Sequence, residues 1–512
     1  MKIYFKQILG LVSIAVLTVG CSEEFLVEEP TGSIINADQL ADAVLLNPSV
    51  GAGTVTGIYS TMFTTGTGGT TSQQDFGQKG YDVYADMLCS DMALSTSTYG
   101  WYRARVTEYQ APLDFTQLEN YQVWRYYYRI INQSNLVIAS LGGNDIVPES
   151  DDNKFTLGQA LAMRAHSYFY LTQFMINDVE ASWNSETLPI YTEPGFVGNP
   201  KSTTQAVYEL MENDLTKAIT LLEGYSRPSK TQVDISIAQT ILGYVLGSTR
   251  TRWADAATVT NAALSNTSAS LLIGIDDPNT TNDETQVVNG VKGGFNDVNS
   301  RSWMWGVDLN ADIGLGLVSW WGQIDLYSYS YAAVGDNKAM DADLYESMAS
   351  DDIRRGQFLN SPTSSRYLQP YLKFYDSDKV VFGTSQIVKA DYVYMRYEEL
   401  LLLNIEALAK SGQEGLAKTK LTTFLENRVG DVSYVAALSG QALYDEIYKQ
   451  TRLELWGEGK SYLAMKRNKA TIVRASNHLS FVGVSIPFDD EKLTFEIPQQ
   501  ELQDNNNITS QN

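Results

Sequence analysis

The surroundings of Cys21 indicate its chemistry more clearly than those of any other reactive side chain. Lys2 and Lys6 precede a mainly apolar stretch at residues 8–19, and Gly20 is the small residue before the cysteine. This order is typical of a secretory signal, because the apolar stretch is well short of the roughly 20 residues that a spanning helix needs. A cysteine at the cleavage point predicts lipid attachment, with Cys21 as the acylated amino terminus of a tethered protein. The alternative is an ordinary signal peptide with a chance cysteine.

Aromatic side chains gather in two segments that lack helical periodicity. Trp303 and Trp305 are two residues apart, so they share a face if the segment is a strand. Tyr327, Tyr329 and Tyr331 have the same spacing. Flat aromatic faces suit sugar rings, whose C–H edges stack on them while the hydroxyls bond to nearby polar groups. These segments are therefore candidate binding surfaces.

The predicted ligand-binding side chains come from the loop at 95–103 and from this middle region. They are Tyr99, Trp101, Tyr102, Arg103, Trp303, Trp305, Trp320, Trp321 and Tyr329. For each ring the alternative is burial in the core, and of the adjacent pair Trp320 and Trp321 one is expected to be buried. We expect replacement of Trp303 or Trp320 to weaken ligand binding more than stability.

Other chemistries find little support in the residue types. The chain has only two histidines, so a multi-histidine metal site is not expected. The pairs Glu398/Glu399 and Glu454/Glu458 resemble a glycosidase dyad in residue type, but we interpret them as salt-bridging residues on helices. No catalytic residue, metal or cofactor is predicted.

Composition limits the class of partner. The formal net charge is −23 and 44% of the residues are hydrophobic, so a sizeable core is expected. An acidic surface argues against binding nucleic acid. Without Cys21 the only cysteine is Cys89, so the mature chain has no intrachain disulfide.

Helical periodicity dominates both ends of the chain. Helices are predicted at 117–141, 157–176, 202–222, 235–246, 253–264, 392–410, 414–428, 441–456 and 460–467. The pair at 395–430 is close to a 34-residue helix–turn–helix repeat. We therefore predict a mainly α fold of TPR-like helix pairs, with an irregular loop and short-strand subdomain inserted between them. The expected divisions are a signal peptide at 1–20, an N-terminal helical region at 21–266, an aromatic-rich ligand-binding subdomain at 267–390 and a C-terminal helical region at 391–512.

Six short motifs in order resemble the SusD/RagB-like family of outer-membrane nutrient-binding lipoproteins. After Cys21 they are the arginine–alanine–aromatic helix at 162–171, Leu188-Pro189-Ile190, Asp352 with Arg354 and Arg355, the arginine–tyrosine–glutamate helix at 395–407, Arg452 with Glu454, Glu458 and Gly459, and the tail at 497–501 with Gln511-Asn512. Two positions depart from the pattern, Lys460 for an arginine and Ala464 for an aspartate, which predicts the loss of an ion pair between helices.

The resemblance implies a function and partners. It implies a SusD-like scaffold, attachment to the outer membrane through a lipid anchor on the cell exterior, and a SusC-like TonB-dependent β-barrel as partner. The implied role is to capture a glycan and pass it inward without catalysis. A peptide receptor of the same architecture is the first alternative, and a glycoside hydrolase is the second.

Overall fold

The computed structural model describes residues 39–512 except 41–42, 45–46, 48, 196, 273–294, 327–328, 372 and 375–386. Cys21 and Tyr327 lie outside the described residues, so the predicted lipid attachment has no structural counterpart here. None of the helices in the described part of the chain combines the length and apolar composition that crossing a membrane requires.

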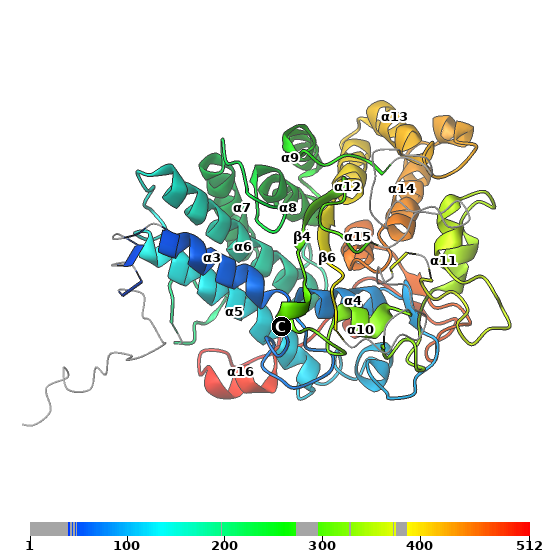
Figure 1. Cartoon of the computed structure of the whole chain (residues 1–512), viewed down its shortest axis with the longest axis horizontal. Helices are drawn as coiled ribbons and strands as arrows, with labels where there is room; N and C mark the ends of the chain where they lie inside the picture. The colour runs from blue at the N-terminus through cyan, green and yellow to red at the C-terminus, as the bar shows by residue number, and fades with distance from the viewer. Residues whose placement is uncertain are drawn as a thin grey trace, which may run out of the picture.

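The N-terminal half forms a series of antiparallel helix pairs. Its helices are α3 (Ser49–Thr61), α4 (Gln78–Leu88), α5 (Leu118–Ser140), α6 (Asp151–Met175), α7 (Thr204–Leu221), α8 (Ile235–Ser248) and α9 (Trp253–Asn266). Each helix from α5 to α9 packs on the next one along the chain (Figure 1). Local signals define the ends: Ser150 Oγ accepts the N–H of Asn153 at the start of α6, which satisfies a backbone donor that the helix leaves unpaired.

The C-terminal half continues the series. Its longer helices are α12 (Tyr397–Lys410), α13 (Glu414–Leu425), α14 (Gln441–Glu454) and α15 (Lys460–Asn468), and the short α16 (Gln499–Asp504) lies near the carboxyl end. Helix α12 packs on α9 as well as on α13 and α14, so the two sets of helices adjoin across the inserted region (Figure 1). The mainly α fold of helix pairs is confirmed.

Short strands and single helical turns make up the rest of the described chain. The strands are β1 (Met92–Leu94), β2 (Glu186–Pro189), β3 (Lys201–Thr203), β4 (Trp303–Val307), β5 (Lys338–Met340), β6 (Tyr392–Arg396), β7 (Ile472–Val473) and β8 (Ser485–Ile486). They pair antiparallel as β1–β5, β2–β3, β4–β6 and β7–β8. The short helices α10 (Trp320–Ile324) and α11 (Ala342–Glu346) belong to the inserted region.

Two predicted elements differ from the structure. Residues 392–396 were expected to begin a helix, but they form β6, because they pair with β4 and the helix starts only at Tyr397. Trp320 and Trp321 lie in the region predicted to consist of loops and short strands, but they begin α10, where Ser319 Oγ accepts the N–H of Gly322 at 3.0 Å. Tertiary pairing and a local cap override the sequence pattern at these points.

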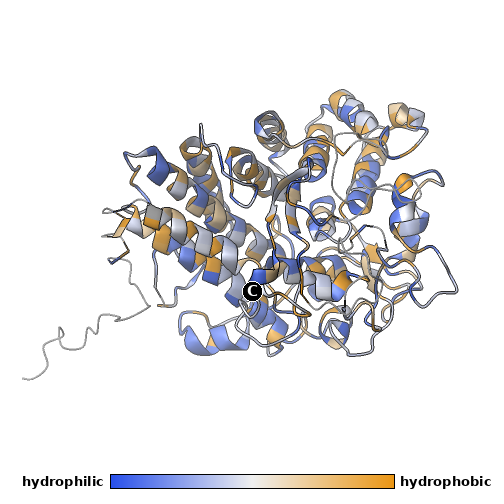
Figure 2. Cartoon of the chain, viewed as in Figure 1, coloured by the Kyte–Doolittle hydropathy of each residue, from blue (hydrophilic) through white to orange (hydrophobic). Residues whose placement is uncertain are grey.

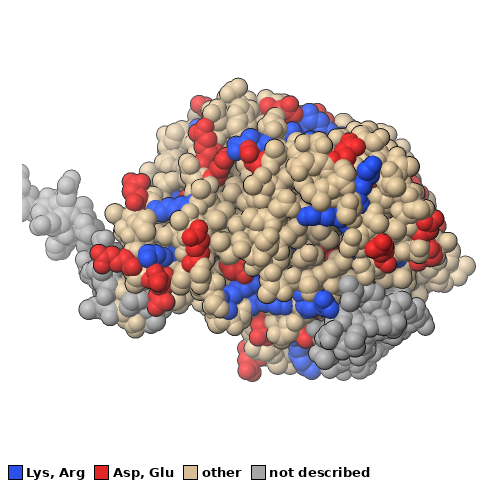
Figure 3. All heavy atoms as spheres, turned by 90° about the horizontal axis from the view of Figure 1, so that it is seen from above, with Lys and Arg blue, Asp and Glu red and all other residues tan. Residues whose placement is uncertain are grey.

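One large hydrophobic cluster joins all three predicted regions of the mature chain. It includes Ile130 and Leu161 from the N-terminal helices, Trp305 from the inserted region and Leu403 from α12. Figure 2 shows apolar residues on the helix sides that face neighbouring helices. On the face drawn in Figure 3, acidic and basic side chains are interspersed and broad areas carry neither.

His166 on α6 makes stability depend on pH. Its ring is buried beside Tyr170 and Trp305, with ring centroids 4.8 and 5.5 Å away. Burial, with a smaller effect of Lys460, lowers its pKa from 6.5 to about 3. The folded chain therefore keeps the neutral ring where the unfolded chain binds a proton.

We expect this histidine to lower the free energy of unfolding by about 1.4 kcal/mol for each pH unit below about 6.5, down to its folded pKa. Denaturant unfolding of the wild type and of His166→Gln between neutral pH and pH 4 measures the effect. The variant should lose stability less steeply as the pH falls. Equal slopes for the two proteins would show that His166 does not titrate in this way.

Candidate ligand-binding site

Two segments that are distant in sequence meet beside a short strand pair. Strands β1 and β5 pair with Met92 opposite Met340 and Leu94 opposite Lys338. Beyond this pair, the segment after β1 runs alongside the segment before β5. The N–H of Ser95 donates to the carbonyl of Asn337 at 3.0 Å, and the N–H of Thr98 donates to the carbonyl of Gly335 at 3.1 Å. The predicted loop at 95–103 and the described end of the tyrosine segment, 329–331, are thereby brought together.

Asp336 fixes the conformation of the first segment. Its Oδ1 accepts the backbone N–H of Thr98 at 2.7 Å and that of Tyr99 at 3.1 Å. Gly335 has φ +114°, and a Cβ there would lie 2.3 Å from Thr98 Oγ1, so only glycine fits without displacement. The loop that carries Tyr99 is thus held by a buried carboxylate and a close backbone approach.

Three rings from these segments form a cluster. The ring centroid of Tyr331 lies 5.4 Å from that of Tyr99 and 5.9 Å from that of Trp101, both in edge-to-face geometry. Tyr331 also donates its hydroxyl hydrogen to Gln73 Oε1 at 2.9 Å. We call Tyr99, Trp101, Tyr329 and Tyr331 the aromatic cluster, since Tyr329 lies two residues before Tyr331.

The aromatic cluster presents both apolar and polar groups to solvent. Tyr99 is 54% exposed and Tyr329 is 44% exposed, although large apolar rings in this chain are mostly buried. Burial, with Tyr99 and Tyr329 nearby, raises the pKa of Tyr331, so its hydroxyl stays neutral at physiological pH. The indole nitrogen of Trp101 is buried and has no hydrogen-bond partner among the described residues. Exposed tyrosines, which combine a flat ring with a hydroxyl, suit a ligand with both C–H faces and hydroxyls.

Arg103 and Tyr102 lie beside the aromatic cluster in sequence but differ in environment. Arg103 is exposed and forms an ion pair with Glu108 at 3.0 Å. Tyr102 has φ 66°, and this left-handed backbone turns its ring into the core against Tyr84, 5.8 Å away. Because Tyr102 is fully buried, its ring offers no face to a ligand, and we correct the prediction for this residue.

The tryptophans of β4 are core residues. Trp303 and Trp305 are 0% and 1% exposed. Strand β6 pairs with β4 at this point, and the ring of Trp305 packs edge-on against Tyr59 and Tyr394. The indole of Trp305 donates to the carbonyl of Thr231 at 3.3 Å. Both rings are therefore buried in the core, which is the alternative stated for them, and the ring of Trp305 packs against residues of α3, α6 and β6.

Trp320 and Trp321 are also sealed from solvent, each 2% exposed. The ring of Trp320 lies 4.5 Å from that of Phe374, and the indole of Trp321 donates to the carbonyl of Ala390 at 2.7 Å. Both rings are buried, and not only one as expected, because α10 packs into the inserted region. The expectation that replacing Trp303 or Trp320 spares stability is withdrawn with them.

The glutamates considered as a dyad belong to a buried ion cluster. Arg396 lies 2.9 Å from Glu454, 2.8 Å from Glu458 and 3.0 Å from Glu398. Arg428 adds a 3.0 Å contact to Glu454. Burial alone would raise the pKa of Glu454, but Arg428 and Arg396 hold it well below its usual range. The prediction of salt-bridging residues is confirmed, although the pairs link different elements and do not run along one helix face.

Lys460 also keeps an ion pair. Its Nζ lies 3.3 Å from Glu399 Oε1, and both side chains are buried. The expected loss of a helix–helix ion pair at this position is therefore wrong: lysine supplies the charge in place of arginine. Within the described parts of the chain, no group of three or more His, Cys, Asp or Glu is placed to hold a metal ion.

Comparison with known families and structures identifies the class of protein. A family model described as "Starch-binding associating with outer membrane" matches residues 69–239, and the model of the SusD family matches residues 356–512. The chain belongs to the SusD/RagB-like family, whose members bind carbohydrates and are associated with the outer membrane. The comparison with curated proteins returns no match.

Solved structures share the fold along nearly the whole chain. A SusD-like carbohydrate-binding protein from Bacteroides vulgatus is 22% identical with a TM-score of 0.71, covering 90% of this chain and 97% of its own. A SusD superfamily protein from Bacteroides thetaiotaomicron is 21% identical with a TM-score of 0.72, covering 91% and 99%. Surface glycan-binding protein A from Bacteroides thetaiotaomicron is 15% identical with a TM-score of 0.66, covering 91% and 98%.

Residues that sequence reasoning missed complete the site. Gln73 reaches Tyr331 from the segment before α4, and Asp336 orders the loop at 98–99. Neither has a motif, so no local pattern indicates them. Tyr331 shares the alternating spacing of Tyr327 and Tyr329, and that spacing was the signal that would have added it to the predicted set.

Proposed function

We propose that this protein captures oligosaccharides at the aromatic cluster on the cell surface and delivers them to a SusC-like TonB-dependent transporter without altering them. The observation that carries the proposal is the meeting of Tyr99 and Trp101 with Tyr331, from segments more than 200 residues apart, at a place where Tyr99 is half-exposed. Folding thus orders these two segments, at a cost in conformational entropy, and leaves part of the ring cluster accessible to solvent.

The family supports a carbohydrate as the ligand. A family model that matches this chain is described by starch binding, and one structurally similar protein is named a surface glycan-binding protein. The aromatic cluster adds the chemistry, because exposed rings with adjacent hydroxyl and amide groups match the alternating faces and edges of a sugar. The proposed site combines residues from the N-terminal region with residues from 267–390, so it reaches beyond the predicted bounds of the ligand-binding subdomain.

The buried ion cluster supports a binding role without catalysis. Glu398, Glu454 and Glu458 are at most 5% exposed and contact arginine. A glycosidase needs two carboxyl groups that reach a sugar from opposite sides, whereas these carboxylates contact arginine and, for Glu398, the backbone N–H of Leu272, all within the core. Tethering through Cys21 and docking on the barrel complete the proposal, in keeping with the outer-membrane association of the family.

Replacing Tyr99 by alanine is expected to lower affinity for the bound oligosaccharide at least about tenfold, which corresponds to about 1.4 kcal/mol. The loss follows from removing an exposed ring that stacks on the sugar. Because the ring is 54% exposed, the melting temperature should change little. Calorimetry with a panel of neutral glycans and a panel of peptides measures the affinities.

Tyr434→Ala is the matched control, since this tyrosine is 40% exposed but lies on a separate turn at Ser433–Ala437. Its affinity should equal that of the wild type. Binding of peptides in preference to every glycan would replace the proposal by the peptide receptor. Sustained release of reducing ends would replace it by the hydrolase.

A further inference from the structure

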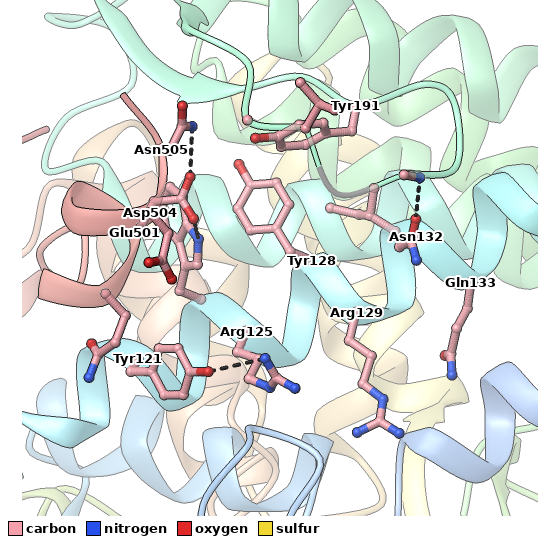
Figure 4. A pocket seen from close by; sticks show the side chains of 16 residues that line it. Tyr121, Arg125, Tyr128, Arg129, Asn132, Gln133, Tyr191, Glu501, Asp504 and Asn505 are labelled. Carbon is pink, nitrogen blue, oxygen red and sulfur yellow. Dashed lines mark hydrogen bonds between the residues drawn. The ribbon is translucent and has the colours of Figure 1, made fainter. Parts of the chain in front are cut away.

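A second cavity lies on the outer face of α5, apart from the aromatic cluster. It has a volume of about 560 Å³, which is in the range of ligand pockets. Helix α16 and residues Tyr191, Gly195, Val197 and Gly198 form its other walls (Figure 4). No residue that lines it belongs to the aromatic cluster. We call it the α5–α16 groove.

Aromatic rings line the middle of the α5–α16 groove. The ring of Tyr128 lies 4.7 Å from that of Trp124 and 5.6 Å from that of Tyr191. The tyrosine hydroxyls are fixed by the backbone, because that of Tyr128 donates to the carbonyl of Pro189 at 2.9 Å and that of Tyr191 accepts the N–H of Asn199 at 3.0 Å. This wall is therefore preorganised.

One side of the groove carries hydrogen-bond acceptors. Glu501 is held by two donors, the indole of Trp124 at 3.2 Å and the amide of Asn505 at 2.8 Å. Asp504, one helical turn further on α16, is exposed, and its carboxylate makes no hydrogen bond or ion pair with the described residues. Figure 4 shows both carboxylates on the α16 side of the groove. Carboxylates are strong acceptors for hydroxyl groups.

The other side carries two cations that form no ion pair among the described residues, although Arg129 acts at longer range on the carboxyl of Asp75, whose pKa it lowers against the larger effect of burial. Arg125 and Arg129 are exposed and four residues apart on α5, so they share one face of the helix. Arg125 donates to the hydroxyl of Tyr121 at 3.1 Å, and neither guanidinium has a carboxylate within ion-pair distance among the described residues. In a chain of net charge −23, where acids outnumber bases, two such neighbouring arginines are unusual. A guanidinium binds a carboxylate through two parallel hydrogen bonds.

We propose that the α5–α16 groove is a second binding site, for an oligosaccharide that contains a uronic acid unit. The uronate carboxylate pairs with Arg125 and Arg129, the hydroxyls of the chain donate to Glu501 and Asp504, and the sugar faces rest on Tyr128 and Tyr191. Asn132, whose Oδ1 accepts the N–H of Gly195 at 3.1 Å, leaves its amide hydrogens for ring or hydroxyl oxygens. The inference extends the proposed function to a second site and an acidic ligand.

Uronate trisaccharides and their neutral counterparts test the proposal. The probes are trimers of galacturonate, glucuronate and mannuronate, each with the matching neutral hexose trimer, measured by calorimetry on the full chain. Tyr99→Ala serves as background, so that binding at the aromatic cluster is weakened and the groove is observed separately. In this background at least one uronate trimer should bind at least tenfold more tightly than its neutral counterpart, and added salt should weaken the binding.

Arg125→Gln/Arg129→Gln should lower that affinity at least tenfold, whereas Arg252→Gln should not. Arg252 is the matched control because it is exposed at the N-cap of α9, where it pairs with Glu212. Failure of every uronate trimer to bind overturns the inference, even if neutral glycans bind the wild type and the proposed function stands. Equal affinity for uronate and neutral trimers, or binding unaffected by the double substitution, overturns it as well.

Discussion

Replacing Arg396 by methionine is expected to lower the free energy of unfolding by about 3–5 kcal/mol, as breaking a buried ion pair typically does. Arg396 is fully buried and contacts Glu398, Glu454 and Glu458. Its loss leaves carboxylates in the core with fewer cations to compensate them. Methionine keeps much of the volume, so that the change reports charge more than packing.

The loss should also grow as the pH rises. With fewer cations, Glu458 is ionised less readily in the folded variant, so its folded pKa rises. A raised pKa makes folding more favourable at low pH, and the destabilisation should shrink as the pH approaches 4. Urea unfolding of Arg396→Met and of the exposed control Arg252→Met at several pH values measures both effects. A change in unfolding free energy as small as that of the control would show that the buried ion cluster does not stabilise this fold.

Replacing Trp305 by alanine is expected to cost about 3–5 kcal/mol of stability, the usual range for deleting a large buried ring. The ring is 1% exposed and touches Tyr59, His166 and Tyr394, so it joins α3, α6 and β6. Alanine leaves a cavity that these elements fill only in part. Thermal unfolding should show a large fall in melting temperature.

Measurements of ligand affinity distinguish the role of Trp305 from that of the aromatic cluster. Under conditions where Trp305→Ala remains folded, its affinity for the oligosaccharide should stay within a few-fold of the wild type, whereas Tyr99→Ala loses affinity and keeps its stability. An unchanged melting temperature together with lost binding in Trp305→Ala would show that Trp305 belongs to the binding site and not to the core. The pair of variants thus distinguishes core from site by opposite responses.

Much of the helical scaffold is predictable from periodicity, because helices such as α7 bury residues at steps of three or four along one side. The predicted bounds 117–141 and 441–456 lie within two residues of α5 and α14. Residues 392–396 were less tractable, since their apolar pattern continues into α12 and only pairing with β4 makes them a strand. A partner 85 or more residues away leaves no local signal.

Burial of the individual rings was the part that spacing did not resolve. Alternation at Trp303 and Trp305 predicts a shared face but not which element covers it. Tyr99 and Tyr331 carry no mark of their proximity either, because the β1–β5 pairing that joins them spans more than 200 residues. The sequence therefore indicated two aromatic segments, and the fold selects which rings of each remain exposed.

A structure of the complex tests the central proposal most directly. The full chain is crystallised with the neutral oligosaccharide that binds most tightly in the calorimetric panel. We predict a sugar ring in van der Waals contact with Tyr99 or Tyr331 and a sugar hydroxyl within hydrogen-bond distance of a tyrosine hydroxyl of the aromatic cluster. A tightly bound oligosaccharide that touches neither Tyr99, Trp101, Tyr329 nor Tyr331 would contradict it.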